Sequence, residues 1–403
     1  MKHSIPTLHV MRYMGNKQKL LPQIISAVEK HAPPGSIIVD LMAGTHAVGY
    51  SLKSQYRIYA NDVQKYTLPI GKALLCSDGI SVSSEKAKCD LEAFYEENQE
   101  KRIANFFQQH YSDTYLSARQ CAELDSIRYA IERYREDLPN PDRSDLYLTA
   151  LISTVCNAQS TPGHFAQFLP PNHQRTQPLR QIRLWSQFLR YADKLGIHQT
   201  PSLHPLLLPI EKGSDFRDML TDQEWSGNAN RVFAHSWREF FERKDILEEA
   251  SEFGLIYVDP PYSQEQYSRF YHFLETLVLL DQPQTRFKAR YREGRFMSDF
   301  CYRGRVASEF DALLRTTSTV CCCPVLISYG SKGLLPKDRL LEICQRHYEI
   351  VQLEEIPYAH STLGKGNVPD VLELLLSCSR PKNVRASSRH TELQLSRDDQ
   401  RTA

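Results

Sequence analysis

The sequence lacks several patterns that would place it in a class of protein at once. Its ten cysteines include no Cys-x-x-Cys pair with a second pair of ligands, so we predict no metal site. It has neither an apolar signal core at the N-terminus nor an apolar run of the ~20 residues that span a bilayer. These absences predict a protein of a reducing compartment without a membrane partner, and we expect it in the cytoplasm.

An excess of charge of one sign is also missing. Lys and Arg together number 49 and Asp and Glu 48, which gives a formal net charge of +1 over 403 residues. A general attraction of the whole molecule to phosphate is therefore excluded, and any binding of nucleic acid must come from local patches. The length allows one large domain or two.

The glycine-rich loop Gly-x-Gly-x-x-Gly of dinucleotide-binding proteins is absent as well. Instead, residues 36–39 predict a short strand that ends at Asp40, and a turn of small residues with Gly44 leads into a helix. Residues 57–60 predict a second strand, which Asp62 follows closely. An acidic residue about 20 positions after the first strand can accept hydrogen bonds from ribose hydroxyls. The pattern indicates a site for a nucleoside without phosphates.

The most informative stretch is 254–262, Gly-Leu-Ile-Tyr-Val-Asp-Pro-Pro-Tyr. Its apolar run predicts a buried strand, and Asp259 stands where this strand ends. The two prolines cannot extend the strand, so the carboxylate of Asp259 and the carbonyl of Pro260 lie at the carboxyl edge of a sheet, where ligands bind. Two acceptors suit the N–H donors of an exocyclic amine on a nucleobase, and Tyr262 could stack on its ring. A structural alternative stays open, in which Asp259 only caps a Pro-Pro turn.

Lys17 and the pair Ser236-Trp237 are further candidate site residues, each beside a predicted helix or strand. Lys17 stands just before a helix, where it could meet a carboxylate; a solvated surface lysine is the alternative. Ser236 and Trp237 follow a strand predicted at 231–234 and again point to the ligand edge of the sheet, unless Trp237 is a core residue. Residues 212–216 are a rival for the same role.

A helical block interrupts the alternation of strands and helices. Apolar residues recur with helical spacing in the segments 90–111, 118–137, 145–157 and 180–195. We therefore predict a mainly helical insert at residues 76–204, within a discontinuous α/β core of residues 1–75 and 205–380. The polar tail, residues 381–403, is expected to be disordered.

Two segments carry side chains suited to nucleic acid. In residues 287–305 basic and aromatic residues alternate, which is typical of segments that hold a phosphate backbone and splayed bases. The candidates for phosphate contacts are Arg290, Arg292 and Arg295. In the insert, residues 157–168 place His164 and Gln167 where they could pair with base edges. The alternatives are a solvated loop for the first segment and a helix-linking loop against the core for the second.

In this order, the elements resemble those of the DNA adenine-N6 methyltransferases, and more closely of the α-group DNA adenine methylases. That group has a Trp/Tyr-x-Gly-Gly-Lys-like start, a Phe-x-Gly-x-Gly-like turn, an Asp ending the second strand, a recognition insert and then Asp-Pro-Pro-Tyr. The matching positions are 13–17, 40–44, 61–62 and 259–262. The resemblance covers roughly residues 10–75 and 225–380. Asn16 departs from the second glycine, and His46 replaces a small turn residue; we interpret His46 as an adapted turn residue rather than a catalyst.

The resemblance implies a Rossmann-like methyltransferase core, with a mostly parallel seven-stranded sheet whose last strand is antiparallel. It implies S-adenosylmethionine as cofactor, held by Tyr13, Lys17, Asp40, Gly44, Asp62, Ser236, Trp237 and Asp259. Asp259, Pro260 and Tyr262 would carry methyl transfer to the N6 amine of an adenine flipped out of double-stranded DNA at a specific site. The insert would recognise the target, and a cognate restriction endonuclease is a candidate partner.

Three other functions stay open from the residues alone. A nucleoside pocket of this kind also suits methylation of RNA bases. A DNA-binding protein with an inactive site is a second alternative, although the intact residues 259–262 argue against it. Methylation of cytosine at N4 is the third, but the corresponding motif more often begins with Ser, so Asp259 favours adenine.

Overall fold

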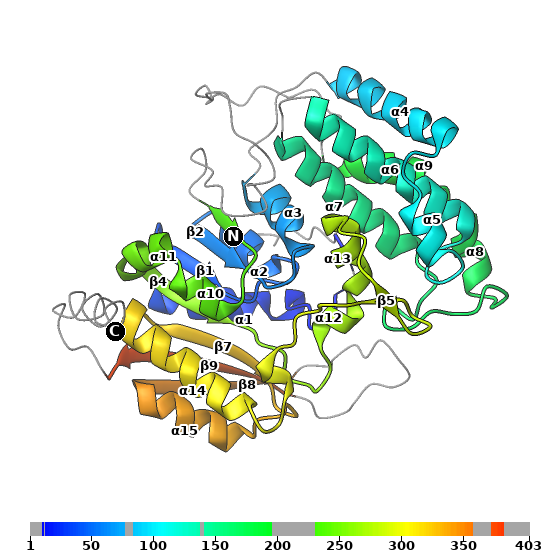
Figure 1. The fold of residues 1–403 in the computed structure, drawn as a ribbon. Helices are drawn as coiled ribbons and strands as arrows, with labels where there is room; N and C mark the ends of the chain where they lie inside the picture. Colours follow the sequence, from blue (N-terminus) through cyan, green and yellow to red (C-terminus); the bar gives the residue numbers. More distant parts are fainter. Residues whose placement is uncertain are drawn as a thin grey trace, which may run out of the picture.

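A seven-stranded sheet forms the centre of the computed structural model, which describes residues 10–11, 13–76, 84–137, 141–195, 230–357 and 372–382 (Figure 1). Its strands are β1 (Ile37–Asp40), β2 (Arg57–Asn61), β3 (Arg231–Phe233), β4 (Phe253–Val258), β7 (Val325–Gly330), β8 (Tyr348–Pro357) and β9 (Leu372–Pro381). Their order in the sheet is β3-β2-β1-β4-β7-β9-β8. The strand pairs from β3 to β7 are parallel, whereas β9 runs antiparallel to both β7 and β8. The predicted mostly parallel sheet with an antiparallel last strand is confirmed.

Helices cover both faces of the sheet. They are η1 (Gln18–Leu20), α1 (Leu21–His31), α2 (Ala47–Leu52), α3 (Thr67–Gly71), η2 (Lys72–Cys76), α10 (Trp237–Glu242), α11 (Lys244–Glu249), η4 (Ala250–Glu252), α12 (Tyr267–Phe270), α13 (His272–Leu279), η5 (Asp299–Cys301), α14 (Val306–Thr316), η6 (Thr317–Cys321) and α15 (Lys337–His347). None of the helices in the described ranges has both the length and the apolar character to cross a membrane.

The short strand β1 shows why the sheet is covered on both faces. Ile38 packs into one hydrophobic cluster together with α1, whereas Ile37 and Val39 pack into a second cluster with α14 and α15. Successive side chains of a strand point to opposite faces, so a run of apolar residues needs a cover on each side. Because all four residues of β1 are buried, its last one, Asp40, is carried into the interior at the carboxyl end.

The segment between β2 and β3 continues with a group of helices at one end of the molecule (Figure 1). These are α4 (Ser84–Lys101), α5 (Phe106–Tyr111), α6 (Ala118–Asp137), α7 (Pro141–Ala158), α8 (Thr176–Gln181) and α9 (Leu184–Lys194). The bounds of α6 agree with the helix predicted at 118–137. The rival segment 212–216 and the tail beyond residue 382 lie outside the described residues.

Two of the helices were wrongly predicted as continuous, because each is divided into two helices in the structure. The helix predicted at 90–111 is divided between α4 and α5, because the side chain of Asn98 bonds both the N–H and the C=O of Ala104 and Arg102 adopts a left-handed φ of 54°. The helix predicted at 180–195 is divided between α8 and α9. There the carbonyl of Ile182 accepts hydrogen bonds from side chains of α6 instead of continuing the helix. In both places side-chain hydrogen bonds compete with the helical ladder.

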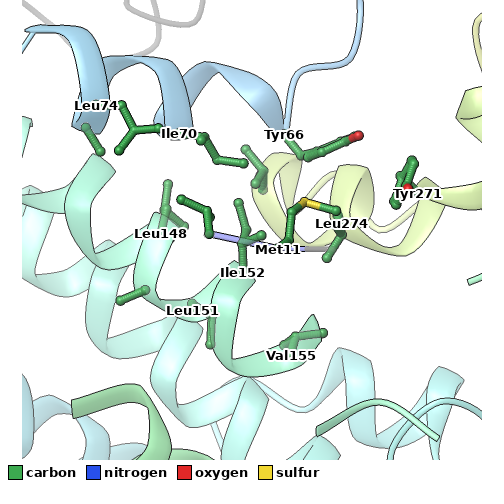
Figure 2. Close-up of a cluster of buried hydrophobic side chains, with 14 of the residues drawn as sticks. Met11, Tyr66, Ile70, Leu74, Leu148, Leu151, Ile152, Val155, Tyr271 and Leu274 are labelled. Carbon is green, nitrogen blue, oxygen red and sulfur yellow. The ribbon is translucent and has the colours of Figure 1, made fainter. Parts of the chain in front are cut away.

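The helices α4–α9 share their hydrophobic core with the sheet. Figure 2 shows Ile70 and Leu74, from α3 and η2, packed beside Leu148 and Ile152 of α7 and Leu274 of α13. Full burial of an aliphatic side chain of this size contributes about 1.5–3 kcal/mol. A junction built from several such side chains holds the helical block firmly against the core.

A two-stranded hairpin, β5 (Thr285–Arg286) and β6 (Tyr291–Arg292), follows α13. The hydroxyl of Tyr111 in α5 donates to the carbonyl of Arg290, 3.3 Å away, and the hydroxyl of Tyr115 donates to the carbonyl of Ala289. These bonds fasten the hairpin to the helical block although the segments are about 175 positions apart in sequence.

The described cysteines are all free thiols. Cys321 and Cys323 are buried, and Cys322 between them is exposed. In the described part of the chain, no three side chains of His, Cys, Asp or Glu gather in an arrangement that could hold a metal ion.

Candidate active site

The carboxyl ends of β1, β2 and β4 surround a cavity of about 260 Å³. The sequence-predicted residues that line it are Tyr13, Lys17, Asp40, Gly44, Asp62, Ser236, Trp237, Asp259 and Pro260. Asp40 is the last residue of β1, and Asp62 and Asp259 follow directly after β2 and β4, so the parallel strands place these three carboxylates at the same edge of the sheet. The structure therefore brings together, in one cavity, residues that stand up to 247 positions apart, from Tyr13 to Pro260.

At one end of the cavity, Asp259 belongs to a buried ionic cluster. The ammonium of Lys17 lies 3.0 Å from Oδ1 of Asp259 and donates to Oε1 of Glu373 over 2.8 Å. The hydroxyl of Ser328 donates to the same oxygen of Glu373 over 2.6 Å. Lys17 and Glu373 are buried, whereas 18% of the Asp259 side chain is exposed, on the side of the cavity.

The surroundings of Asp259 set its charge state. Burial raises the pKa of its carboxyl to about 7, against the effect of the neighbouring Lys17 ammonium, while Glu373 pushes the pKa further up. Burial lowers the pKa of Lys17, but Asp259 and Glu373 outweigh it and raise that pKa well above its usual value. Lys17 is therefore a cation, and Asp259 changes protonation near neutral pH.

The residues after Asp259 differ in their exposure to the cavity. Pro260 is buried and lines it. Tyr262 is not among the lining residues; its ring packs edge-on against Tyr329, with ring centroids 6.2 Å apart. The Lys17 ammonium lies 5.6 Å from the centre of the Tyr262 ring. Tyr262 is thus half-buried beside the ionic cluster rather than inside the cavity.

At the other end of the cavity, backbone N–H groups hold Asp62. Its Oδ2 accepts from the N–H of Gly44 and its Oδ1 from that of Gln64, each over 2.9 Å. Burial raises the pKa of Asp62, while the two backbone hydrogen bonds lower it in part. Each carboxylate oxygen has two lone pairs, so both can still accept a donor from the cavity.

The turn after β1 packs closely around Gly44 and Tyr13. Gly44 has a left-handed φ of +53°, and a Cβ there would lie only 2.9 Å from Cε1 of Tyr13. The ring of Tyr13 stacks on Tyr271 at 4.9 Å. Asp40 at the end of β1 accepts from the N–H of Gly49, and burial raises its pKa to about 7. A residue with a side chain cannot replace Gly44 without moving Tyr13.

His46 in the same turn is a structural residue, as interpreted from the sequence. It adopts a left-handed φ of 60°, and its Nε2 lies 2.8 Å from the carbonyl of Thr67. Complete burial lowers its pKa to about 4, so the imidazole is neutral. It does not line the cavity.

Ser236 and Trp237 form a wall of the cavity at the start of α10. The hydroxyl of Ser236 caps the helix by accepting from the N–H of Glu239, and Glu239 bonds back to the N–H of Ser236. The indole N–H of Trp237 donates to Glu309 over 2.7 Å, and the guanidinium of Arg238 lies 4.2 Å from the indole ring. These contacts fix the plane of the Trp237 ring.

The insert loop that contains His164 and Gln167 rests partly on the core. Phe165 is fully buried, and its N–H donates to the carbonyl of Phe270 over 2.8 Å. The ring of His164 lies 4.8 Å from the ring of Phe270, whereas Gln167 is exposed. The loop is therefore tucked against the core through Phe165, and it leaves His164 partly and Gln167 largely accessible.

The three predicted arginines have different surroundings. Arg290 is exposed. Arg292 forms a two-pronged ion pair with Asp281 at 2.5 and 3.2 Å, and only 9% of its side chain is exposed. Arg295 lies 4.8 Å from the ring of Tyr291, and burial lowers its pKa.

The two predicted nucleic-acid segments lie side by side. The hydroxyl of Tyr291 donates to the carbonyl of Ala166 over 2.6 Å, and Arg269 donates to Tyr291. From the hairpin the chain continues to Phe296 and Met297, which are partly exposed and line the cavity. The hairpin therefore contacts the insert loop, and the chain that follows the hairpin forms part of the cavity wall.

Several residues of the site were not predicted from the sequence. Glu373 completes the ionic cluster, and Gln266, Tyr267, Phe296, Met297 and Glu309 line the cavity. Glu373 had a recognisable signal, because it is a lone carboxylate within the apolar strand β9 and such strands seldom bury a charge without a partner. Its partner Lys17, 356 positions away, was expected to meet a carboxylate, but no local pattern links the two residues.

Comparison with known proteins agrees with this geometry. The profile of the family described as D12 class N6 adenine-specific DNA methyltransferase matches residues 13–187 and 223–319, more than half of the chain. The chain is 25% identical to modification methylase LlaI of Lactococcus lactis subsp. lactis, over 83% of this chain and 49% of that protein. It is also 25% identical to type II methyltransferase M.FokI of Planomicrobium okeanokoites, over 86% and 49%.

A relative of similar length is type II methyltransferase M.NlaIII of Neisseria lactamica, 26% identical over 85% of this chain and 91% of that protein. The chain thus spans about half the length of the first two relatives and most of the third. The match of the family profile includes the turn at Gly44 and the Asp259 motif, which lie at the cavity. The chain belongs to the D12 class N6 adenine-specific DNA methyltransferase family.

Proposed function

We propose that this chain transfers a methyl group from S-adenosylmethionine to the N6 amine of adenine at a specific site in double-stranded DNA. The observation that carries the proposal is a cavity lined by Asp259 and Pro260 after β4 and by Asp62 after β2, on the two sides of β1, which we treat as its two ends. One end offers acceptors for an amine, and the other offers acceptors for the hydroxyls of a nucleoside.

The residues around the turn at Gly44 fit S-adenosylmethionine. Asp62 would accept the ribose hydroxyls, and Asp40 with Gly44 would line the methionine part. The flat ring of Trp237 would lie along the adenine of the cofactor, with Ser236 holding the start of the helix in place. When bound, S-adenosylmethionine supplies a methyl group activated by a sulfonium.

The Asp259 end would prepare the target amine. The N6 lone pair of adenine is delocalised into the ring and is a poor nucleophile. Asp259 and the carbonyl of Pro260 would each accept one N6 hydrogen, which favours the pyramidal amine with a free lone pair, and the extra proton leaves after transfer. Tyr262 would stack on the base. Positioning and electrostatics carry such a reaction.

Lys17 has a place between the two substrates. Its ammonium has three N–H donors, and two of them meet Asp259 and Glu373. The third would reach the carboxylate of the cofactor, with Tyr13 nearby. In this arrangement Lys17 joins the cofactor side of the cavity to the acceptor of the target amine.

The surface beside the cavity would bind DNA. Adenine inside a duplex must be flipped out, at a cost of a few kcal/mol that contacts to the backbone have to offset. Arg290, Arg292 and Arg295 would contact phosphates, and His164 and Gln167 would read base edges. We further propose the helical block as target recognition domain, a cognate restriction endonuclease as partner, and a location in the cytoplasm.

The test is to incubate the chain with S-adenosylmethionine labelled at the methyl group and unmethylated duplex DNA. Digestion to nucleosides should give N6-methyladenine, and sequencing should place it at one short motif. RNA of the same sequence and the Asp259→Ala variant serve as controls. Label in N4-methylcytosine, or in RNA in preference to DNA, would contradict the proposal and identify the alternative.

A further inference from the structure

We infer that Glu373 is a positioning residue for Asp259: through Lys17 it holds the Asp259 carboxylate in place and limits how strongly Lys17 pairs with it. This inference rests on the proposed function. It extends that function to Glu373, which does not line the cavity and acts through Lys17. Ser328 supports the arrangement from the neighbouring strand. The relay runs from Ser328 to Glu373, then to Lys17 and Asp259.

The register of the sheet brings these groups together. Glu373 on β9 lies opposite Gly330 on β7, and Ser328 points to the same face as Gly330 because side chains alternate along a strand. β7 also pairs with β4, at whose end Asp259 stands. Lys17 reaches this place from the segment before η1. Three separate parts of the chain thus converge on one ammonium group.

The apolar strand β9 gives no local reason for a charge at position 373. Glu373 is fully buried in a strand of apolar residues, where a carboxylate without a partner is strongly disfavoured. Replacing a whole buried ion pair by apolar residues of similar volume is often neutral or stabilising, whereas removing one partner alone is costly. A carboxylate that shares the Lys17 ammonium with Asp259, the proposed acceptor of the target amine, therefore points to a role in the site.

The role follows from how one cation is shared by two carboxylates. The pair with Lys17 engages Oδ1 of Asp259, so we assign Oδ2 to the target amine. Without Glu373, the ammonium would pair with Asp259 alone and compete more strongly with the amine for its lone pairs. Glu373 thus lets the Lys17 ammonium orient the Asp259 carboxylate while Oδ2 of Asp259 stays available to the target amine.

Charged and titratable groups from several elements act on Asp259. They are Lys17 before η1, Glu373 on β9, Asp40 on β1, Asp62 after β2, Tyr257 on β4, Tyr267 on α12 and Tyr13 in the N-terminal loop, while Tyr262 acts on Lys17. Among them, Lys17 lowers the pKa of Asp259 and Glu373 raises it. The two residues therefore predict shifts of opposite sign when each loses its charge.

The test is a pH titration of Asp259 by NMR, with ¹³C in the carboxyl groups of aspartate and the signal assigned through Asp259→Asn. In Glu373→Gln the titration of Asp259 should move to lower pH by about one unit. In Lys17→Met it should move to higher pH. In active protein, the acid limb of kcat/KM for methyl transfer should shift in the same directions.

A matched control is Glu123→Gln in α6. Glu123 is also a buried carboxylate that pairs with cations, Arg119 and Arg183, but it belongs to the helical block. This variant should leave the titration of Asp259 unchanged. Glu373→Met offers a second, apolar replacement, which should shift the titration in the same direction as Glu373→Gln.

An unchanged titration of Asp259 in a folded Glu373 variant would overturn the inference. Failure of both Glu373 variants to fold would also overturn it, since the residue would then serve the fold. A wild-type chain that methylates no nucleic acid would overturn the proposed function alone, because the NMR titration reads the carboxylate directly.

Discussion

The two ends of the cavity hold their carboxylates in different ways. Asp259 is held by a charged side chain, the Lys17 ammonium at 3.0 Å, which Glu373 shares. Asp62 is held by two backbone N–H groups at 2.9 Å, from Gly44 and Gln64. The first arrangement depends on the charges of neighbouring side chains, and the second depends on the course of the backbone.

This difference matches the two tasks that we propose. A carboxylate that binds a ribose needs a constant position, which backbone donors provide. A carboxylate that draws on a reacting amine gains from a neighbouring charge that can be balanced, because its attraction for the amine hydrogens must suit the transition state. We therefore expect substitutions at the Asp259 end to impair methyl transfer and substitutions at the Asp62 end to impair cofactor binding.

The largest effect is expected from Asp259→Ala. Methyl transfer should fall by at least ~100-fold, because the amine loses its charged acceptor. Affinity for S-adenosylmethionine should stay within a few-fold, since Asp62 remains intact. Single-turnover transfer of labelled methyl and calorimetry of cofactor binding measure the two quantities. More than a tenth of wild-type activity would remove Asp259 from its role.

The reverse profile is expected for Asp62→Ala. Binding of S-adenosylmethionine should weaken by about 1–3 kcal/mol, the size of hydrogen bonds to a charged group. At saturating cofactor, the rate of transfer should recover most of its wild-type value. Calorimetry on a variant with native circular dichroism decides this, and an unchanged affinity would show that the ribose lies elsewhere.

Substitution of Gly44 should disturb one of the two backbone hydrogen bonds that hold Asp62. In Gly44→Ala the left-handed φ should cost about 1–2 kcal/mol of unfolding free energy, and the new Cβ would also press on Tyr13. Gly35→Ala is the matched control, because Gly35 has φ +86° with nothing within 4 Å of a Cβ. Denaturant titrations should show a larger loss for Gly44→Ala, accompanied by weaker cofactor binding. Equal losses and unchanged binding would argue against a close turn.

The smallest effect concerns the DNA surface, where an exposed and a paired cation can again be compared. Arg290→Ala should flatten the slope of log affinity against log salt by roughly one, because one phosphate contact is lost. Arg292→Ala should change the slope less, since Arg292 is already paired with Asp281. Binding to duplex DNA at several salt concentrations measures both. Identical slopes in wild type and in a variant that replaces Arg290, Arg292 and Arg295 together would show that the segment is a solvated loop.

The sequence predicted those features that depend on local patterns. Short apolar runs ending at Asp40, near Asp62 and at Asp259 predicted strands and the edge where they end, because strand period and proline act within a few residues. The mostly parallel sheet followed from the family resemblance to those same motifs. Trp237 and Ser236 were also expected at this edge, where the capping box of α10 now holds them.

The remaining features depend on contacts between distant segments. The helix breaks at Ile182 and Arg102 follow from side-chain bonds made within the folded helical block. Tyr262 was expected to stack on the target base, and its packing edge-on against Tyr329 of β7, beside the cavity, could not be foreseen. Glu373 meets Lys17 only through the register of β9 with β7, which no local pattern encodes.

The most direct test is a crystal structure of the chain with S-adenosylhomocysteine and a duplex that contains the mapped methylation site. The account predicts the ribose of the cofactor on Asp62 and an extrahelical adenine whose N6 lies within hydrogen-bond distance of Asp259 and the carbonyl of Pro260. A cofactor whose ribose lies at Asp259, or a target base that contacts neither acceptor, would contradict the division of tasks between the two ends of the cavity.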